Sequence, residues 1–485
     1  MDAITSVPNP ANEPVRSYAP GSRERASLEA RLKEMGAESI ELTQTIGGEA
    51  RLGGGERIDV VQPHRHEAVL GTLGSSTGDD VAAAIASAQA AAPGWRALSF
   101  DDRAAVFLKA ADLLAGPWRD SVNASTMLGQ SKTVHQAEID AACELIDFWR
   151  FNVAFARQVL ADQPMSSAGM WNRMEHRPLE GFVMAITPFN FTSIAGNLPT
   201  APALMGNVVI WKPATTQQLS AHYLMRVLEA AGLPPGVVNM LTGHGKPVSE
   251  VALGSPELAG IHFTGSTPVF QHLWRTVGTN IDRYRGYPRL VGETGGKDFV
   301  IAHASADPEP LVVGLLRGAF EYQGQKCSAA SRAYIPTTLW DGGVRDGLVA
   351  GAEEMTYGDV TDFAQFGGAV IDRRSYDRLA GVLARLRDDP AVRILAGGTC
   401  SAAGGFFIRP TVLVCDDPGH EVFTTEYFGP ILAVRVYDEA EYAVTMLNAA
   451  DAAPYALTGA FFANDRVAIE EAQRVLRFSA GNFYV

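Results

Sequence analysis

Cysteine is scarce and scattered in this chain. The four cysteines stand far apart and form no Cys-x-x-Cys pair: Cys143, Cys327, Cys400 and Cys415. Neither a disulfide framework nor a zinc ribbon is therefore indicated. His64 and His66 fit a solvated turn between strands better than a metal site, because no second cluster of ligands accompanies them. We expect no bound metal.

Runs of basic residues are also absent. The chain has 40 Lys and Arg against 54 Asp and Glu, a net charge of −14, and it lacks the positive stripe with which proteins follow a phosphate backbone. Nucleic acid is not expected as a partner. Residues 1–5 have neither the basic segment nor the apolar core of a signal peptide, which predicts a cytoplasmic location.

Uninterrupted apolar runs of membrane-spanning length are lacking as well. Residues 181–211 carry no charge over 31 positions, which is long enough to cross a bilayer. Prolines and asparagines interrupt this run, at Pro188, Asn190, Asn197, Pro199, Pro202 and Asn207. The pattern favours short buried strands and a helix, so no membrane partner is expected.

The sequence does contain a repeated alternation of strand, turn and helix. Strands are predicted over residues 182–187, 208–211, 237–241 and 260–264, with a helix over 219–231. Such alternation predicts a parallel, doubly wound α/β sheet that binds ligands at the carboxyl ends of its strands. A second α/β region is predicted after Lys297, with a helix over 311–322 that leads into the Gly324 loop.

Other elements are predicted before this alternation. They are a hairpin over 57–73, a helix capped by Thr77 that runs through Ala91, a helix over 101–115, and a long helix over 134–160. The long helix is predicted from apolar residues at the spacing of one helical face, namely Ile139, Ala142, Ile146, Trp149 and Val153. Residues 1–45 resemble a polar arm, and residues 162–181 an excursion that pairs with a neighbouring subunit.

The predicted strand ends carry residues suited to a dinucleotide. The run Thr187-Pro188-Phe189-Asn190 follows the first strand, Lys212 ends the second, and Thr264-Gly265-Ser266 ends the fourth. A glycine and a hydroxyl at a helix start can approach a pyrophosphate, and a lysine can hydrogen-bond a ribose. Asn190 can either cap the next helix or stabilise an oxyanion.

One cysteine and one carboxylate form a candidate catalytic pair. Cys327 follows the loop Gly324-Gln325-Lys326, and Glu293 lies 34 residues earlier in a glycine turn. A thiolate attacks carbonyl carbon, and a carboxylate activates water for release of the product; Lys326 can lower the thiol pKa. The alternatives are an inert core cysteine and an acid that only caps a turn. Glu426, near Phe428, is either a surface acid or a ribose ligand.

In chain order these residues resemble the aldehyde dehydrogenase superfamily over residues 48–485. The matching motifs are Pro188-Phe189-Asn190-Phe191, Gly206-Asn207-Val208-Val209 to Lys212, Phe263-Thr264-Gly265-Ser266, Glu293-Thr294-Gly295-Gly296-Lys297, Gly324-Gln325-Lys326-Cys327 and Glu426-Tyr427-Phe428-Gly429-Pro430. Within the superfamily the chain is most similar to the L-glutamate γ-semialdehyde dehydrogenases, through runs that begin at Gln136, Phe148, Thr187, Gly324 and Ala480.

The resemblance implies an aldehyde dehydrogenase-like α/β fold. It consists of an N-terminal arm (1–45), a Rossmann-type NAD-binding domain (46–161 and 182–292), a small β oligomerisation flap (162–181) and an α/β catalytic domain (293–485). It also implies a homodimer or higher homo-oligomer and a functional link to proline dehydrogenase. Family members continue past Val485 with a glycine-rich loop that binds the substrate carboxylate, so we expect the C-terminal end of the catalytic domain to be missing here.

The resemblance further implies a reaction and its residues. Cys327 attacks L-glutamate γ-semialdehyde, Asn190 and the Cys327 backbone N–H hold the oxyanion, hydride passes to NAD, and Glu293 activates water against the thioester. This is the second step of proline degradation. The implied cofactor-binding residues are Thr187, Pro188, Phe189, Lys212, Thr264, Gly265, Ser266, Glu426 and Phe428. The implied substrate-binding residues are Ser328, Phe191, Lys326 and Glu144.

Several alternatives stay open at this point. Many relatives have an acidic residue where this chain has Thr215, and such an acid would repel the 2′-phosphate of NADP. Another semialdehyde, such as succinic semialdehyde, is a rival substrate. An inactive, truncated binding or scaffold form and a cysteine hydrolase are rival functions.

Overall fold

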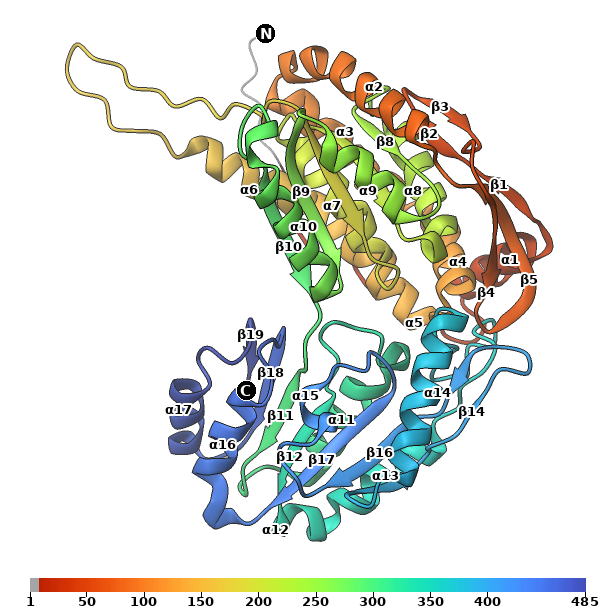
Figure 1. Cartoon of the computed structure of the whole chain (residues 1–485), viewed down its shortest axis with the longest axis vertical. Helices are drawn as coiled ribbons and strands as arrows, with labels where there is room; N and C mark the ends of the chain where they lie inside the picture. The colour runs from red at the N-terminus through yellow and green to blue at the C-terminus, as the bar shows by residue number, and fades with distance from the viewer. Residues whose placement is uncertain (1–7) are drawn as a thin grey trace. The chain divides into compact units, whose positions relative to one another are not determined.

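The computed structural model describes residues 8–485 and divides the chain into two compact units (Figure 1). Unit 1 comprises the described chain up to Val61 with Ala68–Gln130 and Val134–Glu293, and unit 2 comprises Gln62–Glu67, Ser131–Thr133 and Thr294–Val485. Each unit has a sheet with its own hydrophobic cores, which confirms the predicted α/β class. Residues 1–7, the start of the predicted arm and the basis of the predicted location, lie outside the described residues.

Unit 1 is built on a seven-stranded sheet. In spatial order its strands are β10 (Arg289–Thr294), β9 (Leu258–Gly265), β6 (Phe182–Thr187), β7 (Val208–Pro213), β8 (Val238–Met240), β2 (Gln44–Ile46) and β3 (Glu49–Arg51). Strand β6 pairs in parallel with β7 and β9, and β7 pairs in parallel with β8. These four strands are the four predicted from the alternation.

Both faces of this sheet are apolar. Odd-numbered positions of β6 and β7 join one hydrophobic core and even-numbered positions join another, because successive side chains of a strand point to opposite faces. The first core contains Val183, Ala185, Val209 and Trp211, and the second contains Phe182, Met184, Val208 and Ile210. A sheet that is apolar on both faces must be covered by helices on both.

The helices of unit 1 provide this cover. They are α1 (Arg23–Ala37), α2 (Gly78–Ala97), α3 (Phe100–Ala115), α4 (Arg119–Gln130), α5 (Val134–Ala137), α6 (Glu144–Ala161), α7 (Thr192–Leu204), α8 (Gln218–Ala231), α9 (Gly245–Gly254) and α10 (Thr267–Thr279), with 3-10 turns at Thr215–Gln217 and Ile281–Arg283. Helices α3, α6, α7 and α8 contribute to the first core and α2, α9 and α10 to the second. A further sheet contains β1 (Ile40–Leu42), β5 (Arg65–Gly74) and β4 (Arg57–Gln62), as the predicted hairpin requires.

Helix α2 begins and helix α8 ends at the predicted residues, but α2 ends later than predicted. The Thr77 hydroxyl accepts a hydrogen bond from Asp80 N at 3.3 Å and caps α2 as predicted. This helix continues to Ala97, past the predicted end at Ala91, because Ala92 and Trp95 are still buried. The left-handed conformation of Gly232 (φ 93°) ends α8 at the predicted residue.

The long helix predicted over residues 134–160 contains a π-helical turn. Helix α5 leads into the π-turn Glu138–Cys143, which leads into α6. Ile139, which was predicted to lie on the buried face, is 42% exposed. The prediction was wrong at this residue because a π-turn shifts the register of the helical faces. Beyond α6, residues 162–181 form the yellow two-armed loop that projects from unit 1 in Figure 1, with Met165 92% exposed and Trp171 79% exposed.

Unit 2 is built on a second seven-stranded sheet. Its order is β13 (Val392–Ala396), β16 (Thr411–Cys415), β17 (Ile431–Tyr437), β12 (Arg332–Pro336), β11 (Phe299–Ala302), β18 (Thr458–Phe462) and β19 (Asn482–Tyr484). The pairing is parallel except between β13 and β16. A two-stranded sheet joins β14 (Cys400–Ser401) to β15 (Phe407–Ile408).

The helices of unit 2 complete the fold. They are α11 (Pro308–Phe320), α12 (Thr337–Leu339), α13 (Arg345–Glu354), α14 (Arg373–Asp388), α15 (Glu421–Thr424), α16 (Tyr442–Asp451) and α17 (Arg466–Val475), with 3-10 turns at Glu321–Gly324 and Glu439–Glu441 and a π-turn at Trp340–Val344. Helix α11 is the helix predicted over 311–322, and it ends two residues early. Within residues 8–485 no helix has the length and apolar character that crossing a bilayer requires.

Candidate active site

Three of the predicted cofactor-binding strand ends lie together in unit 1. Ile186 of β6 is in register with Lys212 of β7 on one side and Phe263 of β9 on the other. Thr187, Lys212 and Thr264 therefore occupy one edge of the sheet. The carboxyl edge of a doubly wound sheet is where such folds bind ligands.

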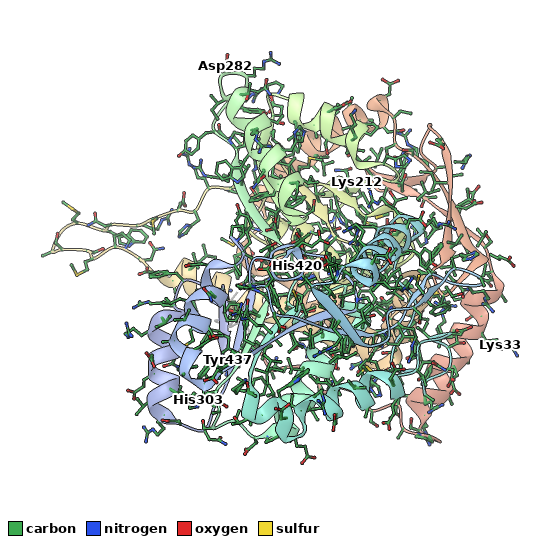
Figure 2. The ribbon with its side chains drawn as sticks, turned by 60° about the horizontal axis from the view of Figure 1, so that its bottom comes forward. Lys33, Lys212, Asp282, His303, His420 and Tyr437 are labelled. Carbon is green, nitrogen blue, oxygen red and sulfur yellow. The ribbon has the colours of Figure 1, made fainter. Side chains whose placement is uncertain are left out.

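Lys212 is a buried amine at this edge. It is 4% exposed, lies within the packed interior of unit 1 (Figure 2) and donates a hydrogen bond to Pro213 O. Burial lowers the pKa of Lys212 to about 7. An ammonium or amine has further donors available, which suit the hydroxyls of a ribose.

The end of β9 leads directly into a helix start. Gly265 is the last residue of β9, and Ser266 precedes α10 without capping it through its side chain. The first backbone N–H groups of a helix are directed at its N-terminal side and bind anions such as a pyrophosphate. The residues at this edge therefore fit a dinucleotide.

The loop that carries Asn190 is fixed by two buried amides. Gln130 Nε2 donates to Phe189 O at 2.7 Å, and Gln217 Nε2 donates to Phe191 O at 3.1 Å. Asn190 is 4% exposed, and the residue that precedes α7 is Phe191. Asn190 is thus held in a buried loop one residue before the N-cap of α7.

Glu144 contacts the first turn of the same helix. Ser193 Oγ donates to Glu144 Oε2 at 2.6 Å. Glu144 is the first residue of α6, immediately after the π-turn. The structure thus brings Glu144 to the helix that begins beside Asn190 and Phe191.

Glu293 and Cys327 belong to different units. Glu293 lies in β10, with an exposed side chain, and is the last residue of unit 1. The glycines of the same motif belong to unit 2, whose longest segment begins at Thr294. Gly296 N donates to Glu426 Oε1 at 3.1 Å, and a Cβ on Gly295 would lie 2.1 Å from the same oxygen. The Glu426 carboxylate therefore packs directly against these two glycines.

Cys327 is half-buried and follows a turn of unusual conformation in unit 2. After α11 ends at Phe320, Tyr322 and Gln323 adopt φ values of 48° and 54°. This left-handed region costs a non-glycine residue about 1–2 kcal/mol. Gly324 continues the turn at φ 65°, and a Cβ there would lie 2.4 Å from Gly429 O. The Cys327 loop and the Glu426 loop thus touch through two glycines.

Neighbouring residues fix the predicted substrate contacts of unit 2. Thr458 Oγ1 lies 3.2 Å from Ser328 O and 2.6 Å from Asp298 Oδ2. Lys326 Nζ lies 3.7 Å from Glu321 Oε2. The charge of Lys326 is therefore shared with a carboxylate and is not directed at the Cys327 thiol alone.

The Glu426 loop is electrostatically unusual. Although the Glu426 side chain reaches solvent, the protein atoms around it desolvate the carboxylate and raise its pKa to about 7. Phe428 adopts a left-handed φ of 51°, and Arg378 donates a hydrogen bond to Tyr427 O. A cavity of about 390 Å³ lies beside this loop, lined by α14 and residues Thr425, Glu426 and Tyr427.

Two buried charges were missed from the sequence, although both lie in the Glu293 motif. Burial, reinforced by Arg332, lowers the pKa of Lys297 to about 7, and burial raises the pKa of Asp298 to about 6. Lys297 Nζ lies 4.8 Å from the centre of the Tyr427 ring. Asp298 accepts hydrogen bonds from Leu457 N and Thr458 N at 2.9 and 3.0 Å. A charged pair directly before the apolar strand β11 was the available signal.

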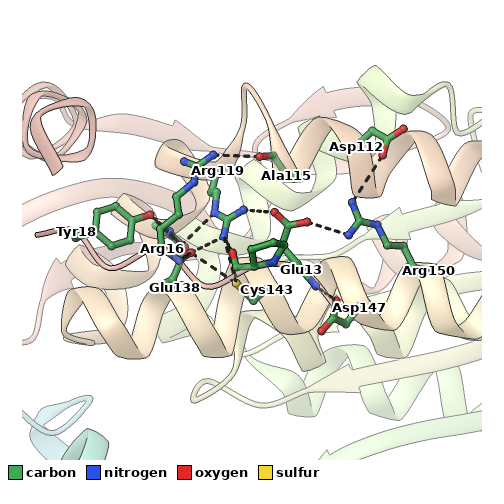
Figure 3. Close-up of polar contacts among 12 residues, drawn as sticks. Glu13, Arg16, Tyr18, Asp112, Ala115, Arg119, Glu138, Cys143, Asp147 and Arg150 are labelled. Atoms are coloured by element: carbon green, nitrogen blue, oxygen red, sulfur yellow. Dashed lines mark hydrogen bonds and ion pairs between the residues drawn. The ribbon is translucent and has the colours of Figure 1, made fainter. Parts of the chain in front are cut away.

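A polar network on unit 1 was also missed (Figure 3). Glu138, which is fully buried, accepts hydrogen bonds from the Arg119 guanidinium, Tyr18 Oη, Arg16 N and Asn123 Nδ2. Two of these donors come from the predicted arm. The network therefore fastens the arm to α4 and to the π-turn. Within residues 8–485 no cluster of three His, Cys, Asp or Glu side chains is arranged to hold a metal.

Comparison with known proteins agrees with the family that the site residues resemble. The model of the aldehyde dehydrogenase family matches residues 51–485. The mitochondrial delta-1-pyrroline-5-carboxylate dehydrogenase of Dictyostelium discoideum is 44% identical, over 100% of this chain and 87% of its own length. The crystal structure of the delta-pyrroline-5-carboxylate dehydrogenase from Mycobacterium tuberculosis bound with NAD is 60% identical, with a TM-score of 0.97, and the match covers 100% of this chain and 89% of that one.

A longer protein also matches. Proline utilization A (PutA) from Bdellovibrio bacteriovorus is 29% identical, with a TM-score of 0.89, over 99% of this chain and 49% of its own length. The motifs expected from the sequence occur in order, the strand ends they predict are present, and the family model spans nearly the whole chain. This chain belongs to the aldehyde dehydrogenase family.

Proposed function

We propose that this protein oxidises L-glutamate γ-semialdehyde to L-glutamate with NAD, the second step of proline degradation. The observation that carries the proposal is the 60% identity, over the whole chain, to a delta-pyrroline-5-carboxylate dehydrogenase bound with NAD. The half-buried Cys327, displayed by a tightly fixed turn, supplies the nucleophile that this chemistry requires.

Cys327 starts the reaction as a thiolate that forms a bond to the aldehyde carbon. The Asn190 amide and the Cys327 backbone N–H donate hydrogen bonds to the resulting oxyanion. When bound, NAD accepts the hydride that leaves this carbon. Glu293 then takes a proton from a water molecule that attacks the thioester, and Cys327 departs with the release of L-glutamate. The exposed position of Glu293 gives its carboxylate access to water.

The cofactor site draws on the strand ends of unit 1. We assign the adenosine ribose to Lys212, whose amine is buried among strand ends, and the pyrophosphate to Gly265 and Ser266 at the start of α10. Thr187, Pro188, Phe189 and Thr264 complete this side, and Glu426 and Phe428 of unit 2 bind the nicotinamide ribose. The raised pKa of Glu426, about 7, favours hydrogen bonding to a hydroxyl over a free surface charge.

Four residues are assigned to the substrate. Ser328 binds the α-carboxylate, and Phe191 packs against the methylene groups. Lys326 and Glu144 lie at the edges of the substrate region and contribute charge, each already held by a neighbour, Glu321 and Ser193 respectively.

The assembly and location follow from the same assignment. Unit 1 is the NAD-binding domain and unit 2 the catalytic domain; residues 162–181, with exposed Met165 and Trp171, are an oligomerisation flap of a homodimer or higher homo-oligomer. A functional link to proline dehydrogenase is supported by the match to proline utilization A. We propose a cytoplasmic location, and the four free cysteines are consistent with a reducing compartment.

The decisive experiment compares NADH formation from L-glutamate γ-semialdehyde and from succinic semialdehyde, with NAD and NADP in parallel. We expect kcat/KM to be at least about tenfold higher for the first substrate, a difference of about 1.4 kcal/mol in transition-state binding. Cys327→Ser serves as the inactive control. Equal rates with both substrates would contradict the assignment, and turnover without a nicotinamide would indicate a cysteine hydrolase.

A further inference from the structure

The turn before Cys327 is held by a buried polar cluster that the mechanism above does not use. We propose that Ser131 and Gln323 are positioning residues, which fix this turn and thereby set the direction in which Cys327 is displayed. The inference rests on the proposed function. Both residues lie in unit 2, although Ser131 comes from the short segment Ser131–Thr133 inserted between two stretches of unit 1.

The turn needs external support because its backbone is strained. Tyr322, Gln323 and Gly324 adopt left-handed φ values of 48°, 54° and 65° in succession. Only the glycine adopts this region without a steric penalty. Non-glycine residues persist there when the surrounding contacts over-determine the conformation. The contacts of Tyr322 and Gln323 are therefore what keeps the turn in place.

The Gln323 side chain provides two of these contacts. Its Nε2 donates to Ala369 O at 2.6 Å and to Ser131 O at 3.2 Å. Gln323 is 1% exposed, so no water replaces these bonds. An amide nitrogen has two hydrogens, and here each hydrogen has its own carbonyl acceptor.

Ser131 closes the cluster from the other side. It is fully buried and is itself left-handed, with a φ of 56°. Its Oγ accepts a hydrogen bond from Ala369 N at 2.8 Å. A Cβ on Gly368 would lie 2.4 Å from this oxygen, so the backbone around Gly368 packs directly against the hydroxyl. Ser131 and Ala369 are thus clamped together, and Gln323 binds both.

The residues on either side of Gln323 are held by the same two segments. Lys132 Nζ lies 4.4 Å from the centre of the Tyr322 ring, and both side chains are buried; such a desolvated cation–π contact is strongly directional. Gln325 Oε1 accepts a hydrogen bond from Ile371 N at 2.9 Å. Support therefore extends from Tyr322 to Gln325, two residues before Cys327.

His64 adds one more contact to this cluster. Its Nδ1 lies 3.1 Å from Ser131 Oγ. Contrary to the solvated turn predicted for it, His64 is 4% exposed and Ser131 is 0% exposed, so the contact is buried.

A displaced nucleophile is costly for this type of catalysis. Attack on an aldehyde requires sulfur and carbon to meet along a defined direction, and a shift of about 1 Å reduces rates by on the order of a hundredfold. If the turn at residues 322–324 relaxed toward ordinary φ values, the backbone would change direction there. Cys327, which follows three residues after the turn, would then move. Loosening the cluster should therefore lower the reactivity of Cys327 and leave NAD binding intact.

The test uses two changes at Gln323 in the full chain. Gln323→Gly removes the side chain with both hydrogen bonds while permitting the left-handed φ, so the substitution adds no backbone strain. Gln323→Glu keeps the shape but directs carboxylate oxygens at two carbonyl oxygens, and the introduced carboxyl can donate a hydrogen bond only when protonated. Tyr437→Phe is the matched control, since it removes another buried hydrogen bond of unit 2, from Tyr437 Oη to Ala302 O at 2.6 Å.

Two readouts are compared for each variant. The first is the rate of alkylation of Cys327 by iodoacetamide, followed by mass spectrometry; the second is kcat and KM for NADH formation. We expect Gln323→Gly to lower kcat by about tenfold to a hundredfold, to change the alkylation rate because the exposure of the thiol changes, and to leave the KM for NAD unchanged. For Gln323→Glu, the differences from wild type in kcat and in alkylation rate should become smaller as the pH falls.

The inference is overturned if either Gln323 variant changes the alkylation rate and kcat no more than Tyr437→Phe does. A fall in NAD affinity with unchanged alkylation would also overturn it. A rapidly alkylated wild type that fails to oxidise L-glutamate γ-semialdehyde would instead refute the proposed function, and alkylation alone would then decide the positioning role.

Discussion

At the scale of single residues, His64 is a titratable group that the fold keeps neutral. Burial lowers the pKa of His64 from 6.5 to about 4, against an opposing effect of Asp359 and with a further lowering by Arg65. As the pH falls, the unfolded state binds a proton at this histidine near pH 6.5, whereas the folded state binds it only near pH 4. The stabilisation that depends on neutral His64 is therefore fully present above pH 6.5. It is lost as the pH falls toward 4, by about 3 kcal/mol in total.

The prediction concerns the pH dependence of unfolding. We expect the free energy of unfolding, measured in urea between pH 4 and pH 7, to fall less steeply with acid in His64→Gln than in wild type. His272→Gln, at an exposed position of α10, is the control and should keep the wild-type slope. Identical slopes for all three proteins would show that His64 is not the titrating group.

The sequence predicts candidate reactive residues but not the residues that support them. Cys327, Glu293 and Asn190 were selected because glycine loops and strand ends carry a chemical signature in short stretches of sequence. Ser131 was not, since it is 192 residues from Gln323 and nothing local marks it. Only the fold brings the two side chains together.

At the scale of elements, the strands and helices that depend on local pattern were predicted well. Strand β6 runs over Phe182–Thr187, as expected from its apolar residues and the turn that follows. The π-turn Glu138–Cys143 was not predicted. Its cause is tertiary, because Glu138 is directed into the network with Arg119 and the arm, and helical periodicity contains no information about that partner.

The network around Glu138 gives a prediction about the arm. Glu138→Gln removes the fully buried carboxylate that faces Arg119 and leaves Glu13 as the remaining carboxylate on the guanidinium. Because one partner remains, we expect a loss of up to the roughly 3–5 kcal/mol that breaking a buried pair costs. Tyr18→Phe removes one hydrogen bond to Glu138 and should cost about 1 kcal/mol. Urea unfolding measures both changes, and tryptic cleavage after Arg16 should accelerate in the same order.

The control for this prediction is Asp112→Asn. Asp112 lies 3.9 Å from Arg150 and its side chain is 81% exposed, so its loss should change stability by less than about 1 kcal/mol. If Glu138→Gln were no more destabilising than Asp112→Asn, the network would not fasten the arm.

At the scale of the whole molecule, the chain is divided in a way that sequence order does not reveal. Gln62–Glu67 and Ser131–Thr133 belong to unit 2, although both are flanked on each side by residues of unit 1. The family resemblance implied residues 46–161 as one continuous part of the first domain, a range that contains both segments. Contacts between distant residues, such as the bonds of Ser131 to Ala369, define this division.

Stability and cofactor binding are opposed at Lys212, which gives a prediction for the whole protein. Burial lowers its pKa from 10.5 to about 7, so at pH 8 the unfolded state gains by charging an amine that the folded state keeps largely neutral. Lys212→Met removes this penalty and keeps an apolar chain of similar length. We expect the variant without NAD to melt no lower than wild type, although it lacks the residue proposed to bind the ribose.

With NAD bound, we expect the wild type to melt at a higher temperature than Lys212→Met. At about 100 times its Kd, a ligand that binds only the folded state adds about 2.7 kcal/mol, and this raises the melting temperature of the wild type. The rise should be largely lost in Lys212→Met and retained in Lys33→Met, which changes an exposed lysine (Figure 2). Thermal melts with and without NAD measure all three proteins. An equal rise in both variants would place the ribose elsewhere, whereas a loss confined to Lys212→Met would mean that the fold carries a destabilising buried amine for the sake of its cofactor.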